Sequence, residues 1–349
     1  MALKQGDKIG ILGGGQLAQL LINAANKLGL KTLVFDPNED SPAFNIATEF
    51  ICEPFSNQKA LESFSKKSDI VTYEFENIPL ATIDIITPHC KVSPNREALK
   101  IGQNRLLEKA FINQLGINTA RYSQISSKKE LLEFCKLTAS KSIIKTTTSG
   151  YDGKGQVVIE PGKINTAAID IIENTQCIVE EFQEFHSEAS VIASRGESGS
   201  VLTYDSGTNL HEDGILIKTM VPSKLPKELE IEMALIAGKI LNKLDYIGVM
   251  GIEFFVTSQG LILNEFAPRV HNSGHWTLDG CLINQFEQHI RAISGWPLGS
   301  TKRHSNIVMT NIIGEKITTD IKENQSIYSY GKKEIRAGRK MGHINTIYE

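Results

Sequence analysis

The sequence predicts an α/β domain, followed in the same chain by an α+β region and a small β-rich segment. Strand and helix patterns alternate over the first hundred residues, which predicts a parallel sheet of the Rossmann-like kind. Strand pairs without helices between them dominate the middle of the chain, and mostly β patterns follow from about residue 296. Because 349 residues exceed what one hydrophobic core usually spans, we expect three domains, at residues 1–103, 104–295 and 296–349.

Composition narrows the possible classes of function. The net charge of −3 gives no basic excess for a nucleic-acid or membrane partner, so we expect neither. The five cysteines are far apart and form no CxxC pair, which predicts no disulfide framework and favours a reducing compartment. The N-terminus lacks the apolar stretch of a signal peptide, and no apolar run is long enough to span a membrane. We therefore expect a cytoplasmic protein.

The first three elements form a βαβ unit. Its parts are a strand at Lys8–Leu12, a turn at Gly13–Gly15, a helix at Gln16–Leu28 and a strand at Lys31–Phe35. The turn reads Gly-x-Gly-x-x-Ala and Asp36 follows the second strand, a pattern typical of NAD-binding domains. Glycine is also favoured wherever a strand passes tightly into a helix. The loop therefore allows three interpretations: NAD, a turn without a ligand, or a different ligand at this edge of the sheet.

The next segments predict one helix and three strand pairs. The run "SPNREALKIGQNRLLEKAFINQLGI" predicts a helix that starts at Ser93-Pro94 and ends at Gly116. After it, "SIIKTTT" is expected to pair with "GQVVIE", and "CIVEEF" with "EASVIAS". The last pair, "GVMGIEFFV" and "LILNEFAP", is joined by "TSQG" and predicts a tight antiparallel hairpin.

A glycine-rich stretch, "KTTTSGYDGKGQ", connects the first of these strand pairs. Its glycines at positions 150, 153 and 155 free backbone amides to converge on an anion, and Lys145 and Lys154 add positive charge. A hairpin tip that folds over phosphates requires this composition. The alternative is a plain flexible turn.

Two glutamates in the last hairpin suggest a metal site. Counted outward from the turn, Glu253 falls opposite or diagonal to Glu265, and like charges that face each other destabilise a sheet. A divalent cation relieves the repulsion, and oxygen-only ligands favour Mg²⁺, with Asn264 able to assist. The alternative is a pair of solvated glutamates, which their strongly apolar neighbours disfavour. The strand "CIVEEFQ" ends in Glu180-Glu181, which can present a carboxylate to an adenine amino group or simply run out into solvent.

Together these motifs resemble the ATP-grasp fold, in which two α+β lobes clasp ATP. The segments "SGYDGKGQ", "NLHEDGIL", "GVMGIEFFV", "NEFAPRVHNSGHWT" and "EIRAGRKMGH" are similar to those of the N5-carboxyaminoimidazole ribonucleotide synthetases of purine biosynthesis. The resemblance covers nearly the whole chain, although Ala267 stands where several other ATP-grasp enzymes place an asparagine metal ligand. It implies a Rossmann-like (pre-ATP-grasp) domain, an ATP-grasp domain with a lid subdomain at about 120–185, and a small C-terminal β-rich domain.

The resemblance also implies a ligand for each motif, with Arg269 and Lys145 in catalysis and Mg²⁺ on Glu253 and Glu265. The residues that it implies for ATP are Arg105, Lys145, Gly150, Tyr151, Asp152, Gly153, Lys154, Gly155, Gln156, Glu180, Glu181, Phe182, Gln183, Glu188, His211, Asn264 and Glu265. Those that it implies for the ribonucleotide and bicarbonate are Gln16, Leu17, Glu74, Tyr151, Arg269, His271, Asn272, Ser273, His275, Lys332, Arg339 and Lys340.

Two of these groups have competing interpretations. His271 and His275 are four residues apart, a zinc-like spacing on a helix, but Pro268 and Gly274 favour a loop that positions the substrate or bicarbonate. Hydrogen bonding within the loop is the alternative. The basic cluster "KKEIRAGRK" is expected to hold the ribonucleotide 5′-phosphate, and a solvated basic face is the alternative.

The implied activity is ATP-dependent carboxylation of 5-aminoimidazole ribonucleotide with bicarbonate, through carboxyphosphate. Two rivals stay open at this point: a formate-using transformylase of the same ATP-grasp family, and a nucleotide-binding module without catalysis. The expected partners are small-molecule substrates and a second copy of the chain in a homodimer.

Overall fold

A four-stranded parallel sheet forms the N-terminal part of the structure, which is a computed structural model describing residues 2–138, 140–150 and 155–349. The strand order is β3-β2-β1-β4, so β1 lies between two parallel neighbours. Strands β1 and β2 are confirmed with the predicted bounds, and the helix between them, α1, ends one residue earlier than predicted. The elements are β1 (Lys8–Leu12), α1 (Gln16–Lys27), β2 (Lys31–Phe35), η1 (Pro42–Asn45), β3 (Glu49–Ile51), α2 (Gln58–Lys66), β4 (Ile70–Tyr73), α3 (Leu80–Ile86) and α4 (Arg96–Gly102).

The single helix predicted from Ser93 to Gly116 is wrong, because two helices occupy that segment. Helix α4 ends at Gly102, and α5 (Arg105–Gln114) begins after Asn104, whose side chain accepts hydrogen bonds from the amides of the first turn of α5. Gly102 also lies against Pro268, so close that a Cβ atom would be 2.9 Å from that ring. The break between α4 and α5 therefore allows Asn104 to cap α5 and Gly102 to pack closely against Pro268 of the body. Helix periodicity in the sequence indicates neither contact.

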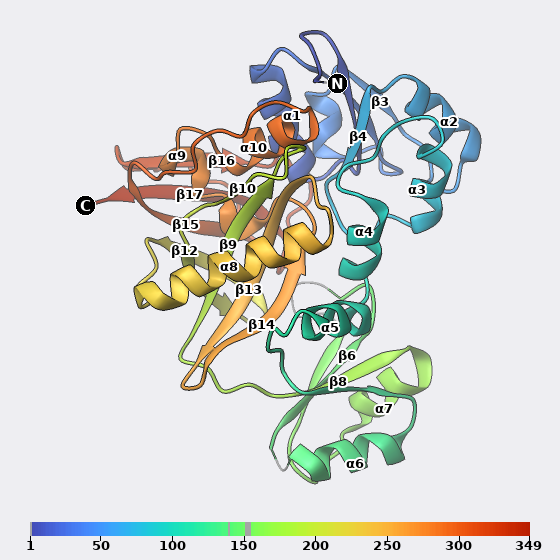
Figure 1. Cartoon of the computed structure of the whole chain (residues 1–349), viewed down its shortest axis with the longest axis vertical. Coiled ribbons are helices and arrows are strands. Elements are labelled where there is room, and N and C mark those ends of the chain that lie inside the picture. Colours follow the sequence, from blue (N-terminus) through green and yellow to red (C-terminus); the bar gives the residue numbers. More distant parts are fainter. Residues whose placement is uncertain (1, 139, 151–154) are drawn as a thin grey trace.

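The lid, residues 122–181, is a separate lobe at the bottom of Figure 1. Its antiparallel sheet has the order β5-β8-β6-β7, and two helices pack on one face through a small core of their own. Because side chains alternate along a strand, Lys145 and Glu180 lie on the opposite face from that core. The lid consists of β5 (Tyr122–Ile125), α6 (Lys128–Thr138), β6 (Ser142–Thr146), β7 (Gln156–Ile159), α7 (Thr166–Asn174) and β8 (Cys177–Glu181).

A nine-stranded sheet forms the body of the molecule, with the path β14-β13-β9-β11-β12-β15-β17-β16 and β10 beside β9. The hairpin of β13 and β14 is confirmed. The predicted pair of "CIVEEF" with "EASVIAS" is wrong, because β8 belongs to the lid sheet while β9 pairs with β13 and β11. The elements are β9 (Ser187–Arg195), β10 (Val201–Thr203), β11 (Gly207–Glu212), β12 (Ile215–Val221), α8 (Lys227–Lys243), β13 (Gly248–Thr257), β14 (Gly260–Ala267), η2 (Asn272–Gly274), α9 (Thr277–Gly280) and α10 (Gln285–Ile293).

The C-terminal strands complete this sheet instead of forming a sheet of their own. They are β15 (Asn306–Ile313), β16 (Gln325–Ser329) and β17 (Lys340–Tyr348), and β15 pairs directly with β12. One continuous hydrophobic cluster joins α1 of the N-terminal domain to α10 and to these strands, through residues such as Leu21, Phe286 and Ile307. The N-terminal domain, the body and the C-terminal strands therefore share a core, whereas the lid packs around its own.

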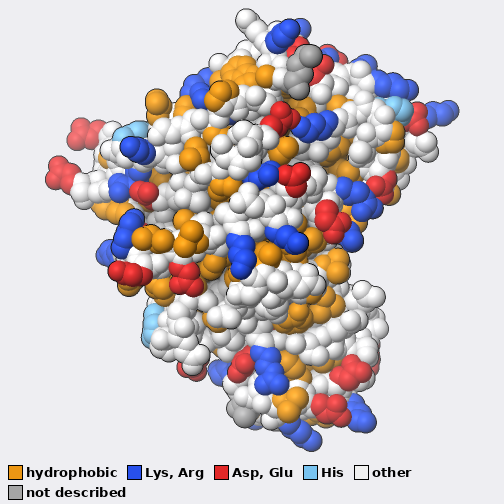
Figure 2. All heavy atoms as spheres, viewed as in Figure 1, with side chains coloured by type: hydrophobic (Ala, Val, Ile, Leu, Met, Phe, Trp, Pro, Cys, Tyr) orange, Lys and Arg blue, Asp and Glu red, His pale blue; other side chains and the backbone are white. Residues whose placement is uncertain are grey.

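The surface shown in Figure 2 carries acidic and basic side chains interspersed over all parts of the molecule. Among the described residues, every helix is too short or too polar to cross a lipid bilayer.

A buried histidine links the N-terminal domain to the body. His289 on α10 has no exposed surface, and its Nδ1 accepts a hydrogen bond from the Val249 amide at 3.1 Å. An amide can only donate, so the ring proton is on Nε2, which donates to Thr72 Oγ1 on β4 at 2.9 Å. Burial lowers the pKa of His289 to about 3. The neutral ring therefore joins the two sheets.

This link predicts acid sensitivity. The folded pKa of His289 is depressed below the unfolded value of about 6.5, so its contribution is complete above that pH and is lost as pH falls toward 3. Between pH 7 and pH 5 the wild-type protein should lose about 2 kcal/mol more unfolding free energy than His289→Gln. Urea denaturation at both pH values measures this. His89→Gln, at an exposed position, is the control and should behave like wild type. If wild type and His289→Gln lost the same unfolding free energy between pH 7 and pH 5, the low pKa assigned to His289 would be contradicted.

Candidate active site

The β13–β14 hairpin brings two carboxylates together. Glu253 and Glu265 are direct partners across the hairpin, as the sequence predicts. The register shifts next to them and leaves Asn264 without a partner, a β-bulge of the kind that redirects side chains beside active sites. Burial raises the pKa of Glu253 to about 7, and the facing Glu265 carboxylate adds to the rise. The pair is an oxygen-only donor set, which suits a hard divalent cation.

Basic residues from α5 and the lid surround one buried glutamate. The Glu180 Oε2 atom accepts from Lys145 Nζ at 3.0 Å and lies 3.4 Å from Lys109 Nζ. Burial acts to raise the pKa of Glu180, but the two lysines outweigh it and hold the pKa below its usual value. The other oxygen, Oε1, is buried without a hydrogen-bond partner in the described part of the chain. An acceptor atom therefore remains for a donor group on a ligand.

Arg105 begins α5 and anchors the glycine-rich hairpin. Its guanidinium donates to the carbonyl oxygens of Thr146 at 2.9 Å and Gly150 at 3.1 Å. Gly155, at φ +72°, lies on the other side of the hairpin, and Gln156 begins β7. The predicted ligand residues Tyr151, Asp152, Gly153 and Lys154 lie outside the described residues.

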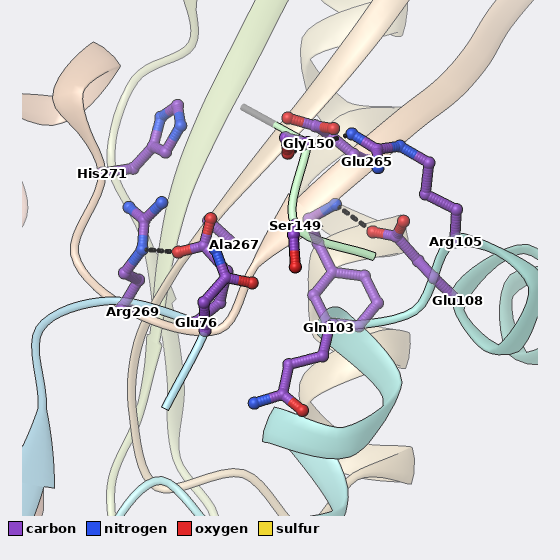
Figure 3. A pocket seen from close by; sticks show the side chains of 13 residues that line it. Glu76, Gln103, Arg105, Glu108, Ser149, Gly150, Glu265, Ala267, Arg269 and His271 are labelled. Carbon is purple, nitrogen blue, oxygen red and sulfur yellow. Dashed lines mark hydrogen bonds and ion pairs between the residues drawn. The ribbon is translucent and has the colours of Figure 1, made fainter. Parts of the chain in front are cut away.

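The first cavity, about 120 Å³, lies between this hairpin and β14 (Figure 3). Arg105, Glu265 and Arg269 line it. Glu108, which the sequence analysis missed, also lines it and accepts from the Phe266 amide at 2.6 Å. Burial and the neighbouring Glu265 raise the pKa of Glu108 to about 8, so this side chain is protonated at neutral pH. A third negative charge beside the Glu253–Glu265 pair is thereby avoided.

The end of β8 and the segment after it lie at a wider cavity of about 500 Å³, which Glu181, Phe182 and Gln183 line together with the tip of the β13–β14 hairpin.

Glu188 on β9 and His211 on β11 form a hydrogen-bonded pair, with Glu188 Oε2 lying 2.7 Å from His211 Nδ1. Burial acts to lower the pKa of His211, but the hydrogen bond to Glu188 and the negative charges of Glu253 and Glu188 together outweigh it and raise the pKa. The structure thus pairs two residues that the sequence placed in separate motifs.

A further cavity of about 380 Å³ opens where the N-terminal domain meets the body. Its lining combines the N-terminal glycine loop with the loop after β14. The predicted residues that line it are Gln16, Leu17, Glu74, Arg269, His271, Asn272 and Lys340. Burial acts to lower the pKa of His271 to about 3, so this ring is neutral.

Two predicted contacts, those of Ser273 and His275, differ from the structure. His275 has no exposed surface and Ser273 is 1% exposed, so neither side chain reaches a cavity. Ser273 Oγ is instead 2.8 Å from His271 Nδ1, and Gln285 Nε2 is 3.1 Å from His275 Nδ1, so hydrogen bonding within the fold explains both. From the basic cluster, Lys332 donates to the Lys340 carbonyl at 2.8 Å and Arg339 to the Glu334 carbonyl at 2.9 Å, whereas Lys340 itself lines the cavity.

The N-terminal glycine loop holds carboxylates of its own chain. The Gly14 amide donates to Asp36 Oδ2 at 2.8 Å, and the Gly15 amide donates to Glu74 Oε1 at 3.0 Å. Asp36 also accepts from Ser41 Oγ at 2.7 Å. Amides that a dinucleotide's pyrophosphate would use therefore already donate to side-chain carboxyl groups.

The architecture and this cleft define an ATP-grasp protein, and the ATP-grasp domain family matches residues 110–286. The ribonucleotide synthetase preATP-grasp domain matches residues 6–103, and the phosphoribosylaminoimidazole carboxylase C-terminal domain matches residues 307–349. An N5-carboxyaminoimidazole ribonucleotide synthase from Brucella melitensis is 44% identical, over 99% of this chain and 98% of that protein. The chain therefore belongs to the N5-carboxyaminoimidazole ribonucleotide synthase family.

Solved structures agree with this membership. An ADP complex of an N5-carboxyaminoimidazole ribonucleotide synthetase superposes with a TM-score of 0.94 at 36% identity, covering 99% of this chain and 94% of that one. An N5-carboxyaminoimidazole synthase from Aspergillus clavatus, in complex with ADP and 5-aminoimidazole ribonucleotide, gives a TM-score of 0.90 at 27% identity, with coverage of 99% and 94%.

The occupied glycine loop predicts that NAD and NADP bind more weakly than about 1 mM. Pyrophosphate would meet the carboxylates of Asp36 and Glu74 where it needs free amides. Calorimetric titration measures the affinity, with ATP under the same conditions as the positive control. Micromolar affinity for either dinucleotide would show that the loop rearranges to accept it.

Proposed function

We propose that the chain carboxylates 5-aminoimidazole ribonucleotide with bicarbonate, using ATP, to form N5-carboxyaminoimidazole ribonucleotide, ADP and phosphate in purine biosynthesis. One observation supports this most directly. The small cavity beside the glycine-rich hairpin and the larger cavity beside the N-terminal glycine loop share four lining residues, Glu76, Asn77, Arg269 and His271. Two substrates bound in these cavities would meet at a common wall.

On the ATP side, the proposal assigns phosphate binding to Arg105 and Lys145, and closure over the phosphates to residues 150–156. The Oε1 atom of Glu180 is buried and has no hydrogen-bond partner among the described residues, which supports its assignment to a donor on the nucleotide, such as the adenine amino group. Glu181, Phe182 and Gln183 would line the base pocket. The hydrogen-bonded pair of Glu188 and His211 would contact the ribose side.

The paired carboxylates support a magnesium site. Glu253 and Glu265 would hold Mg²⁺ with Asn264 beside them, because their mutual repulsion and oxygen donors fit that ion. Mg²⁺ usually takes one or two carboxylates and completes its shell with phosphate oxygens and water, so two glutamates suffice. When bound, the ion supplies charge neutralisation to the phosphates.

On the ribonucleotide side, Gln16, Leu17 and Glu74 would contact the aminoimidazole ribonucleotide, with Lys332, Arg339 and Lys340 toward its 5′-phosphate. The loop after β14 would hold bicarbonate, with Arg269 as the catalytic cation, and His271 and Asn272 beside it. A guanidinium matches the planar, two-oxygen shape of bicarbonate. We expect the active form to be a homodimer, which light scattering tests.

The chemistry then follows in two balanced steps. A bicarbonate oxygen attacks the γ-phosphorus, the bond to the β-phosphate oxygen breaks, and carboxyphosphate and ADP form. The exocyclic amine then attacks either the carboxyl carbon of carboxyphosphate, from which phosphate leaves with the bonding pair, or the CO₂ that carboxyphosphate has released together with phosphate. In both routes the amine gives up a proton. Lys145 and Arg105 stabilise charge on the transferred phosphoryl group. Carboxyphosphate decomposes readily in water, so closure of the lid must exclude solvent.

An ADP-release assay tests the proposed reaction. Full rate should require ATP, aminoimidazole ribonucleotide and bicarbonate together, and formate should not replace bicarbonate. Turnover of formate with glycinamide ribonucleotide would establish the transformylase instead. Nucleotide binding without ADP release under any combination would establish a binding module.

The metal assignment predicts that Glu265→Gln lowers turnover by about 10²-fold or more, the scale of losing one preorganised electrostatic contact. The substitution removes a charge and keeps the shape, so circular dichroism and the melting temperature should change little. Steady-state rates with varied Mg²⁺ are the measurement. Glu228→Gln, an exposed carboxylate in the first turn of α8, is the control and should keep the wild-type rate. Wild-type turnover of Glu265→Gln would remove this residue from the metal site.

The phosphate assignment predicts that Arg339→Ala raises the KM for the ribonucleotide by about one to two orders of magnitude, since a charge-assisted contact contributes about 1.5–3 kcal/mol. The KM for ATP should change little, because ATP binds on the lid side. Arg336→Ala is a matched control in the same segment, because that exposed arginine pairs with Glu334. A defect that falls mainly on ATP would show that the segment serves the nucleotide.

A further inference from the structure

The four residues shared by the two cavities come from two different domains. Glu76 and Asn77 follow β4 of the N-terminal domain, whereas Arg269 and His271 follow β14 of the body. Figure 3 shows Glu76 and Arg269 side by side at one end of the first cavity, joined by an ion pair. The wall between the cavities is therefore an interface between domains, held by a contact in its middle.

Arg269 is fixed at two points in this wall. Its Nε atom donates to Glu76 Oε2, and its Nη1 atom donates to the Val270 carbonyl at 3.1 Å. The side chains of Arg269 and Glu76 are 15% and 22% exposed, so the pair is largely shielded from solvent. Burial acts to raise the pKa of Glu76, but the guanidinium outweighs it and holds the pKa below its ordinary value. Glu76 is therefore ionised at neutral pH.

The position of Arg269 demands such a constraint. A free arginine has several rotatable bonds, and on this wall it would face phosphate-binding groups on one side and a ribonucleotide cavity on the other. Anions in either cavity would draw the guanidinium away from the junction. The Glu76 carboxylate at Nε and the Val270 carbonyl at Nη1 together orient the plane of the guanidinium, and these two contacts use only two of its five N–H donors, so donors on its Nη atoms remain for a planar acid.

We propose that Glu76 is a positioning residue that holds Arg269 at the junction, so that the activated carboxyl group passes to the ribonucleotide amine before water destroys it. The inference rests on the proposed carboxylation. In that reaction, carboxyphosphate loses its C–O bond to phosphate as the amine nitrogen bonds to the carboxyl carbon. When Arg269 is not held, the same intermediate decomposes in water to bicarbonate or CO₂ and phosphate, and the ATP already used gives no product.

If the Glu76–Arg269 ion pair only held the two domains together, its loss would affect stability and not the ratio of product to ADP. The two domains are already joined by the buried His289, by the α1–α10 packing and by the 2.6 Å ion pair of Lys27 with Glu287. Losing the shielded Glu76–Arg269 ion pair would lower stability, while the other contacts keep the two domains joined. It would not change how many ATP molecules are used for each product molecule.

The decisive measurement is the ratio of carboxylated product to ADP in Glu76→Gln, at saturating substrates. Product formation should fall by about tenfold or more, the range expected when a reacting group is displaced by a fraction of an ångström to one ångström. ADP release should fall much less, so the ratio should drop from near one to well below it. The KM for ATP should stay within about twofold of wild type. Glu76→Asp keeps the charge and should recover part of the ratio.

Asp84→Asn is the matched control, because it breaks an exposed ion pair with Arg96 in the same domain. Its ratio should stay near one. A ratio near one in Glu76→Gln, with product and ADP lowered together or unchanged, would overturn the proposal. If Glu76→Gln is unfolded at the assay temperature, the product-to-ADP ratio of Glu76→Asp becomes the test. A ratio of one in Glu76→Asp would overturn the proposal. Failure of the proposed function is distinguishable, because wild type would then form no carboxylated product from bicarbonate.

Discussion

Charge compensation among closely spaced carboxylates is the constraint on which the cleft depends. Glu180 is held by two lysines, Glu76 by an arginine and Glu188 by a histidine, and Glu108 is kept neutral by its raised pKa. Glu253 and Glu265 instead face each other across a hairpin. The cleft thus compensates the other carboxylates internally and leaves one close pair facing each other, which is where the proposed divalent cation would bind.

The division of cores is consistent with the lid closure proposed above. The lid packs around its own small cluster and is tied to the body by α5 and by the segment between β8 and β9. The N-terminal domain, the body and the C-terminal strands share one cluster. Movement of the lid therefore need not disturb the wall where the two cavities meet. Arg105 contributes to both parts, since it starts α5 and binds the glycine-rich hairpin.

The sequence predicted what local patterns determine. The first βαβ unit and the register of Glu253 with Glu265 follow from short-range periodicity and a tight turn, and both are confirmed. The pairing of "CIVEEF" failed, because alternation indicates a strand without indicating its partner. His275 looked accessible in a polar run, but tertiary packing buries it. Lys109 was missed although it lies one helical turn after Arg105, and Glu76 was missed because its partner is nearly two hundred residues away.

The placement of β15 beside β12 has a consequence for how the chain is made. Until residues 306–313 leave the ribosome, β12 is an edge strand and the cluster around Trp276 lacks Ile307 and Met309. At typical synthesis rates, about ninety residues separate these two strands by on the order of ten seconds. The lid can fold on emergence because it packs around its own core, but the rest of the molecule waits with an open sheet edge and uncovered apolar surface. Its half-made state is thus the stage of synthesis at which chaperones have the most to protect.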